Sequence, residues 1–97
     1  MADAESVGRV DDAATDTMVQ IFVRFSESRV VLKATFRTFG CSACIAASSM
    51  LTEMLVGQWA APTAAEIEAA LGGLPDDKRY CAELVAEAAA RALRAVD

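Results

Sequence analysis

Apolar and polar side chains alternate through the stretch that decides the fold, residues 17–39, which read TMVQIFVRFSESRVVLKATFRTF. A period of two in residues 17–25 and again in residues 29–39 is typical of half-buried strands, and the polar SES between them favours a turn. The side chains expected to face inward are Val19, Ile21, Val23, Phe25, Val30, Leu32, Ala34 and Phe36. The stretch predicts an antiparallel hairpin whose apolar face other elements must cover, because two strands alone are barely stable in water.

Three helical segments are expected after the hairpin. Good helix formers fill residues 44–56, and Gly57 ends them. Thr63 and Glu66 form a Thr-x-x-Glu capping box that opens a short second helix. The last helix, roughly residues 79–96, carries small and apolar residues at spacings of three and four. The order β-β-α-α-α predicts an α+β fold, in which helices pack on one face of a small antiparallel sheet that a third strand can extend.

The first 15 residues are small and acidic and show no periodicity. We therefore expect residues 1–15 to be a flexible lead-in and residues 16–97 to form a single domain. A chain of 97 residues suffices for one hydrophobic core but not for separate substrate and cofactor domains. We therefore expect no large multi-domain enzyme.

Composition and charge narrow the class of partners. Although 55% of the residues are hydrophobic, 21 residues are alanine, and no apolar run approaches the roughly 18 residues of a membrane-spanning helix. The first residues, MADAE, lack the basic start of a signal peptide. The net charge of −5 argues against binding to a phosphate backbone. We expect a soluble, cytoplasmic protein with neither a membrane nor a nucleic acid as partner.

Cysteine is the chemical resource that stands out, because the chain contains no histidine and three cysteines, Cys41, Cys44 and Cys81. An odd number favours free thiols, a metal or a cluster over a framework of disulfides. Cys41 lies just ahead of a predicted helix and Cys81 in the first turn of another, where a helix N-terminus favours thiolate over thiol. A single C-x-x-C pair is a weak zinc signal. The alternative is that these cysteines simply fill the core as small hydrophobic residues.

Two segments resemble signatures of the IscU/NifU/SufU-type iron–sulfur cluster assembly scaffolds. Residues 35–49, TFRTFGCSACIAASS, are similar to the family pattern F-[KR]-T-F-G-C-x-x-A-I-A-x-S-S, and residues 74–85, LPDDKRYCAELV, are similar to L-P-P-x-K-x-H-C-S-x-L-A. The opening, VGRV at residues 7–10 followed by DTM at residues 16–18, resembles V-G-x-V and G-D-x-M of the same family. The resemblance covers nearly the whole chain.

The resemblance implies a function and a site. Such scaffolds are not enzymes in the turnover sense: they receive persulfide sulfur from a cysteine desulfurase, bind iron or zinc, and build a [2Fe–2S] cluster for recipient apo-proteins. By correspondence, Cys41 and Cys81 match the second and third cluster cysteines and are the candidate sulfur acceptors. Asp16 matches the family's aspartate ligand, and Lys78 matches a lysine expected to act in docking or in the electrostatics of the site.

This chain also departs from the family pattern. The family's first cysteine has no counterpart in residues 12–16, Tyr80 replaces the histidine beside the third cysteine, and Asp76 replaces a proline. Cys44 is a gain, because the family normally has alanine there. If Cys44 turns toward the site, it restores three thiolates. If it turns into the core, a cluster needs thiolates from a second subunit of a homo-oligomer or from an external thiol.

Three hypotheses about function follow. The first is a scaffold or carrier that binds a [2Fe–2S] cluster, iron or zinc through Cys41, Cys81 and Asp16 with help from Cys44. The second is a relay that accepts persulfide sulfur without building a cluster. The third is an adaptor that binds the desulfurase although its site has lapsed. A small α+β domain whose thiols only fill the core is the unrelated alternative.

Overall fold

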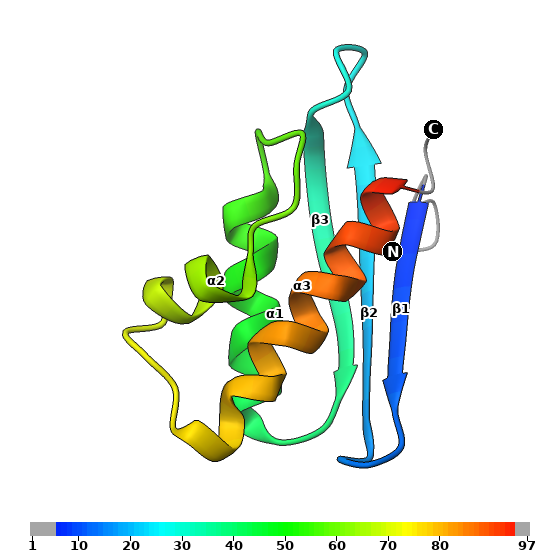
Figure 1. The fold of residues 1–97 in the computed structure, drawn as a ribbon. Coiled ribbons are helices and arrows are strands. Elements are labelled where there is room, and N and C mark those ends of the chain that lie inside the picture. Colours follow the sequence, from blue (N-terminus) through cyan, green and yellow to red (C-terminus); the bar gives the residue numbers. More distant parts are fainter. Residues whose placement is uncertain (1–5, 95–97) are drawn as a thin grey trace.

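Three antiparallel strands form one sheet in the order β1-β2-β3, and helices cover one of its faces (Figure 1). The computed structural model describes residues 6–94. The strands are β1 (Ser6–Asp12), β2 (Thr17–Phe25) and β3 (Val31–Phe39), and the helices are α1 (Ser42–Leu55), α2 (Ala64–Ala70), the 3₁₀ turn η1 (Asp76–Lys78) and α3 (Arg79–Arg94). The predicted α+β architecture, with helices packed on one face of an antiparallel sheet, is confirmed. Within residues 6–94, no helix combines the length and hydropathy needed to cross a membrane.

Strand β1 corrects the prediction of a flexible lead-in over residues 1–15, because residues 6–12 pair with β2 along their whole length. Residues 1–5 of that segment lie outside the described residues. The inner face of β1 begins with Ser6 and Gly8, which carry no hydrophobic signal in the sequence. Helix α3 packs directly on this face: a Cβ atom on Gly8 would lie 1.9 Å from the carbonyl oxygen of Ala88. The Ser6 hydroxyl also donates a hydrogen bond to the carbonyl of Ala92.

The predicted hairpin forms, but a bulge changes which residues of β3 face inward. Phe25 pairs with Val31 and Arg24 with Lys33, so that Leu32 has no partner in this register. Val31 is consequently buried and Leu32 is 60% exposed, which makes the inward prediction wrong for Leu32. Beyond the bulge the alternation recovers, and Ala34 and Phe36 pack against the core as expected. An extra residue in one strand changes which face of the sheet the side chains before it point to, relative to the side chains after it.

The core lies between the sheet and the helices. Its large, fully buried side chains come from β2, β3, α1, α2 and α3, and they include Ile21, Leu51, Ile67 and Val85. Helix α3 contributes mainly alanines, which let its backbone approach the sheet closely. The capping box predicted at Thr63 is confirmed, since its hydroxyl accepts from the Glu66 backbone N–H while the Glu66 carboxylate accepts from the Thr63 N–H.

Candidate metal centre

The helix N-termini that carry the cysteines converge at one end of the molecule. Helices α1 and α3 both begin at the lower end of Figure 1, where the turn between β1 and β2 also lies. Gly40 connects β3 to α1 in a tightly packed place. A Cβ atom at this position would lie 3.1 Å from Thr17 Cγ2 and 3.6 Å from the Cβ atom of Cys44. Cys41 is the N-cap residue of α1, and its carbonyl accepts hydrogen bonds from the backbone N–H groups of Cys44 and Ile45 at 3.0 and 3.2 Å.

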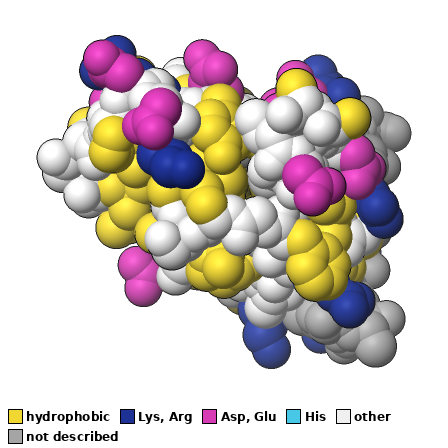
Figure 2. All heavy atoms as spheres, turned by 90° about the horizontal axis from the view of Figure 1, so that it is seen from below, with side chains coloured by type: hydrophobic (Ala, Val, Ile, Leu, Met, Phe, Trp, Pro, Cys, Tyr) yellow, Lys and Arg dark blue, Asp and Glu magenta, His cyan; other side chains and the backbone are white. Residues whose placement is uncertain are grey.

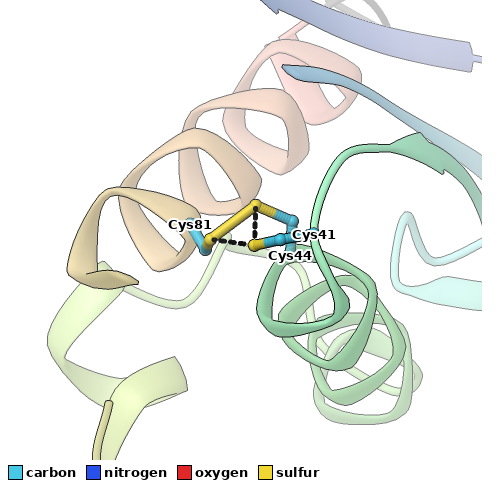
Figure 3. A group of neighbouring side chains, drawn as sticks. All are labelled: Cys41, Cys44 and Cys81. Carbon is cyan, nitrogen blue, oxygen red and sulfur yellow. Dashed lines mark hydrogen bonds between the residues drawn. A yellow bond between two sulfur atoms is a disulfide. The ribbon is translucent and has the colours of Figure 1, made fainter. Parts of the chain in front are cut away.

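The three cysteines form one cluster (Figure 3). Cys44 and Cys81 are joined by a disulfide, with their Cα atoms 4.8 Å apart. The Cys41 Sγ atom is 3.8 Å from each of the other two Sγ atoms, and Cys41 is the free cysteine. Cys44 therefore lies in the core and also points toward the site, so the two orientations weighed from the sequence coincide. Cys44 and Cys81 are fully buried, whereas Cys41 is partly exposed.

The oxidation state decides what this cluster can bind. A disulfide sulfur is no thiolate, so the oxidised chain offers only the Cys41 sulfur as a ligand. Reduction would release the thiols of Cys44 and Cys81 beside the free thiol of Cys41, in a group whose sulfurs lie within 4.8 Å of one another. Thiolates suit zinc and iron–sulfur centres. Metal–sulfur bonds of about 2.3 Å in a tetrahedral centre correspond to sulfurs about 3.8 Å apart. The Cys41 sulfur already stands at that separation from both partners, so the three residues fit such a centre once they are reduced.

Electrostatics favour the thiolate form of Cys41. Burial raises the pKa of the Cys41 thiol, but the backbone N–H of Cys44, the Tyr80 hydroxyl, the backbone N–H of Ala43 and the charge of Lys78 together hold that pKa below its ordinary value. The Tyr80 hydroxyl oxygen lies 3.7 Å from the Cys41 Sγ atom. The hydrogen bond to Cys41 is the main reason that the pKa of Tyr80 is raised, and burial adds to the rise. Tyr80 therefore remains a neutral donor next to the thiolate.

Asp16 and Lys78 take different places relative to the cluster. Asp16 lies exposed in the β1–β2 turn with a left-handed φ of 53°, and it borders a surface groove together with Met18 and Phe39. Among residues 6–94, the ligand-type side chains grouped closely enough for one metal ion are the three cysteines, and Asp16 is outside that group. Lys78, in η1, is half-buried, and its charge contributes to the lowered pKa of Cys41 and partly offsets the rise in the pKa of Tyr80.

Tyr80 is the residue whose role at the site the sequence did not reveal. In the sequence, Tyr80 stands out only as a replacement for the family histidine. Its position next to Cys81 in the chain was a usable signal, because a polar ring at the start of α3 can reach the N-terminus of α1. What could not be foreseen is that the hydroxyl approaches Cys41 rather than its neighbour Cys81.

The end of the molecule that carries the cysteines is chemically mixed. Figure 2, which views this end from below, shows hydrophobic side chains interspersed with acidic and basic ones. Phe39 and Ile45, on either side of the β3–α1 connection, are 57% and 45% exposed. The Arg37 guanidinium lies 5.7 Å from the centre of the Phe39 ring. Apolar surface is thus exposed close to the residues that enter the cluster.

Comparisons with known proteins agree with the fold. The chain is 38% identical over 95 residues to "Iron-sulfur cluster assembly scaffold protein IscU 1" of Archaeoglobus fulgidus, covering 94% of this chain and 61% of that protein. It is 38% identical over 89 residues to the IscU protein of Aquifex aeolicus, covering 87% of this chain and 57% of the relative. The chain therefore spans about three fifths of the length of these curated relatives.

A solved structure and a family description complete the comparison. The crystal structure described as an iron–sulfur cluster assembly scaffold for the SUF system of Fervidobacterium islandicum AW-1 superposes with a TM-score of 0.68 at 18% identity, covering 96% of this chain and 83% of that one. At that identity the match supports the fold alone. The family description "NifU-like N terminal domain" matches residues 1–96. The chain therefore belongs to the NifU-like N-terminal domain family.

Proposed function

We propose that this protein is an iron–sulfur cluster assembly scaffold or carrier that takes sulfur from a cysteine desulfurase and holds an iron–sulfur cluster or metal ion as cargo. The observation that carries the proposal is the convergence of the Cys41, Cys44 and Cys81 sulfurs within 4.8 Å of one another at the N-termini of two helices. The curated relatives at 38% identity are themselves named as such scaffolds. The proposed role is to hold and pass on a group, not to turn over a substrate, and it suits a soluble cytoplasmic protein.

Each of the three cysteines has a distinct proposed role. Cys41, the accessible thiol, receives sulfur and is the first ligand. Cys44 supplies the thiolate that the family's missing first cysteine would have supplied, and Cys81 supplies the third. A [2Fe–2S] cluster held by four protein ligands needs one more group. Asp16 is the candidate within the chain if the β1–β2 turn rearranges, and a thiolate of a second copy is the candidate outside it.

Lys78 and Tyr80 support the cluster from one side. Their charge and hydroxyl favour a thiolate at Cys41. The same positive charge would balance part of the negative charge that thiolates and sulfide accumulate around iron. Phe39 and Ile45 offer exposed apolar contacts beside the site for the desulfurase or for a recipient apo-protein.

Anaerobic reconstitution tests the proposal. The reduced full chain is incubated with ferrous iron, cysteine and a cysteine desulfurase, and a thiolate-to-iron absorption band is expected. The variant Cys41→Ser/Cys81→Ser should lose the band, whereas Ser42→Ala, an exposed position in the first turn of α1, should keep it. A wild-type chain that never develops the band, or a double variant that retains it, would refute the proposal. Zinc content after purification under reducing conditions identifies a single-metal alternative.

The second candidate function, sulfur relay without a cluster, is favoured by the Cys44–Cys81 disulfide. A chain that works in this way accepts a persulfide and binds no metal in the same experiment. The adaptor hypothesis makes a third forecast: a variant with all three cysteines changed should still bind the desulfurase. Measuring metal, persulfide and desulfurase binding on one set of variants separates the three functions.

A further inference from the structure

The three thiols differ in access although they are close in space. Cys41 is partly exposed, whereas Cys44 and Cys81 have no exposed surface. Sulfur that arrives from outside as a persulfide must therefore be taken up by Cys41. Once there, it lies next to two buried cysteines, because the Cys41 Sγ atom is 3.8 Å from the sulfurs of both.

We propose that, in the reduced chain, the three cysteines cleave a persulfide on Cys41 to free sulfide and leave the Cys44–Cys81 disulfide as the oxidised product. The proposal rests on the proposed function only in that sulfur arrives on Cys41 as a persulfide. It assigns to Cys44 a role besides that of a metal ligand. The disulfide in the structure is then the end state of a reaction that the cysteines perform.

The first step is an attack by a buried thiolate on the Cys41 sulfur. A bond forms between the Cys44 or Cys81 Sγ atom and the Cys41 Sγ atom, while the bond from Cys41 to its outer sulfur breaks. The outer sulfur leaves with the electron pair and takes up the proton released by the attacking thiol, giving hydrogen sulfide. The outer sulfur is thereby reduced, the attacking thiol is oxidised, and no other reagent is consumed.

The second step is an exchange inside the cluster. The remaining buried thiolate attacks its buried partner in the new disulfide, the Cys44–Cys81 bond forms, and Cys41 leaves as a free thiol. This exchange moves the disulfide into the core and returns the accessible thiol to its starting state. Cys41 can later attack the buried disulfide from 3.8 Å and bring it back to the surface. An external dithiol, the class of reductant that resets disulfides, can then reduce it there.

The test uses the full chain, reduced and free of metal, with a chelator present and oxygen absent. One equivalent of glutathione persulfide is the sulfur donor. The wild type should release close to one equivalent of sulfide and end with a Cys44–Cys81 disulfide, read by intact mass and peptide mapping. Some sulfide can also come directly from the donor, in which case a glutathione adduct forms on Cys41. That sulfide equals the amount of adduct and is subtracted. The variant Cys44→Ala/Cys81→Ala should retain the persulfide on Cys41 and release sulfide at least about tenfold more slowly, since it lacks a neighbouring thiol.

A second variant keeps the test decisive if the double variant does not fold, as judged by circular dichroism. Cys41→Ser leaves both buried thiols in place and should release no more sulfide than the donor does alone. The proposal is overturned if wild type keeps a stable persulfide, if the double variant releases sulfide as fast as wild type, or if Cys41→Ser matches wild type. Because no metal is present, these outcomes are independent of the reconstitution band, so failure of cluster assembly and failure of persulfide cleavage are distinguishable.

Discussion

Replacing Gly8 by alanine should force helix α3 away from strand β1. The added Cβ atom would lie 1.9 Å from the Ala88 carbonyl oxygen and 2.5 Å from the Ala92 nitrogen. Both are backbone atoms of a helix, so no side-chain rotation relieves the contact. Since Cβ contacts shorter than 3.0 Å essentially do not occur in proteins, the two elements must separate by at least about 1.1 Å at this point.

The expected cost of Gly8→Ala is a net loss of about 2 kcal/mol in the free energy of unfolding. Overpacking a core costs about 1–3 kcal/mol, and a contact between two backbones belongs at the upper end. The lower entropy of the unfolded alanine chain offsets about 0.4–1 kcal/mol, because Gly8 does not have a positive φ. With a urea dependence of about 1 kcal/mol per molar for a small protein, the unfolding midpoint should fall by about 2 M.

Urea unfolding of the oxidised chain, followed by circular dichroism, measures this effect. Val7→Ala is the matched control, because Val7 is the neighbouring residue on the opposite face of β1 and is 43% exposed. Its loss should stay below about 1 kcal/mol. If Gly8→Ala costs less than about 0.5 kcal/mol, α3 does not pack against the small-residue face of β1 as closely as the distances at Gly8 require.

Three further predictions concern the site and its supports. Tyr80→Phe removes a hydrogen bond that favours the Cys41 thiolate, so the pKa of Cys41 should rise and the pH profile of its alkylation by iodoacetamide should move to higher pH; an unchanged profile would argue against the contact. Reducing the Cys44–Cys81 disulfide, whose cysteines are 37 residues apart, should lower stability by about 3–4 kcal/mol in denaturant titrations, and Cys44→Ala/Cys81→Ala, which leaves a single thiol, should be insensitive to dithiothreitol. Thr63→Ala breaks the capping box of α2 and should cost about 1 kcal/mol by the same titrations, whereas a loss near zero would mean that the cap contributes nothing to stability.

The hairpin and the helices could be predicted because their patterns are local. The alternation in β2, the capping box at Thr63 and the small-residue stripe of α3 each depend on neighbours within a few positions, so the printed sequence contains the whole signal. Strand β1 was missed because its inner face opens with Ser6 and Gly8. Small residues fit there because α3 packs on them, and the α3 residues in contact lie 80 or more positions away, which is information that no short stretch of sequence contains.

The candidate site, too, has features that the sequence indicates and features that only the tertiary structure decides. The sequence by itself singled out three cysteines, two of them three positions apart across a helix start, and Lys78 just ahead of the third. Only the tertiary structure decided that Cys44 joins Cys81, that Cys41 remains accessible, and that Asp16 lies outside the cluster. The physical reason is that the packing of α1 against α3 sets these distances, and such packing depends on the shapes of both helices and the sheet beneath them, not on the spacing of residues along the chain.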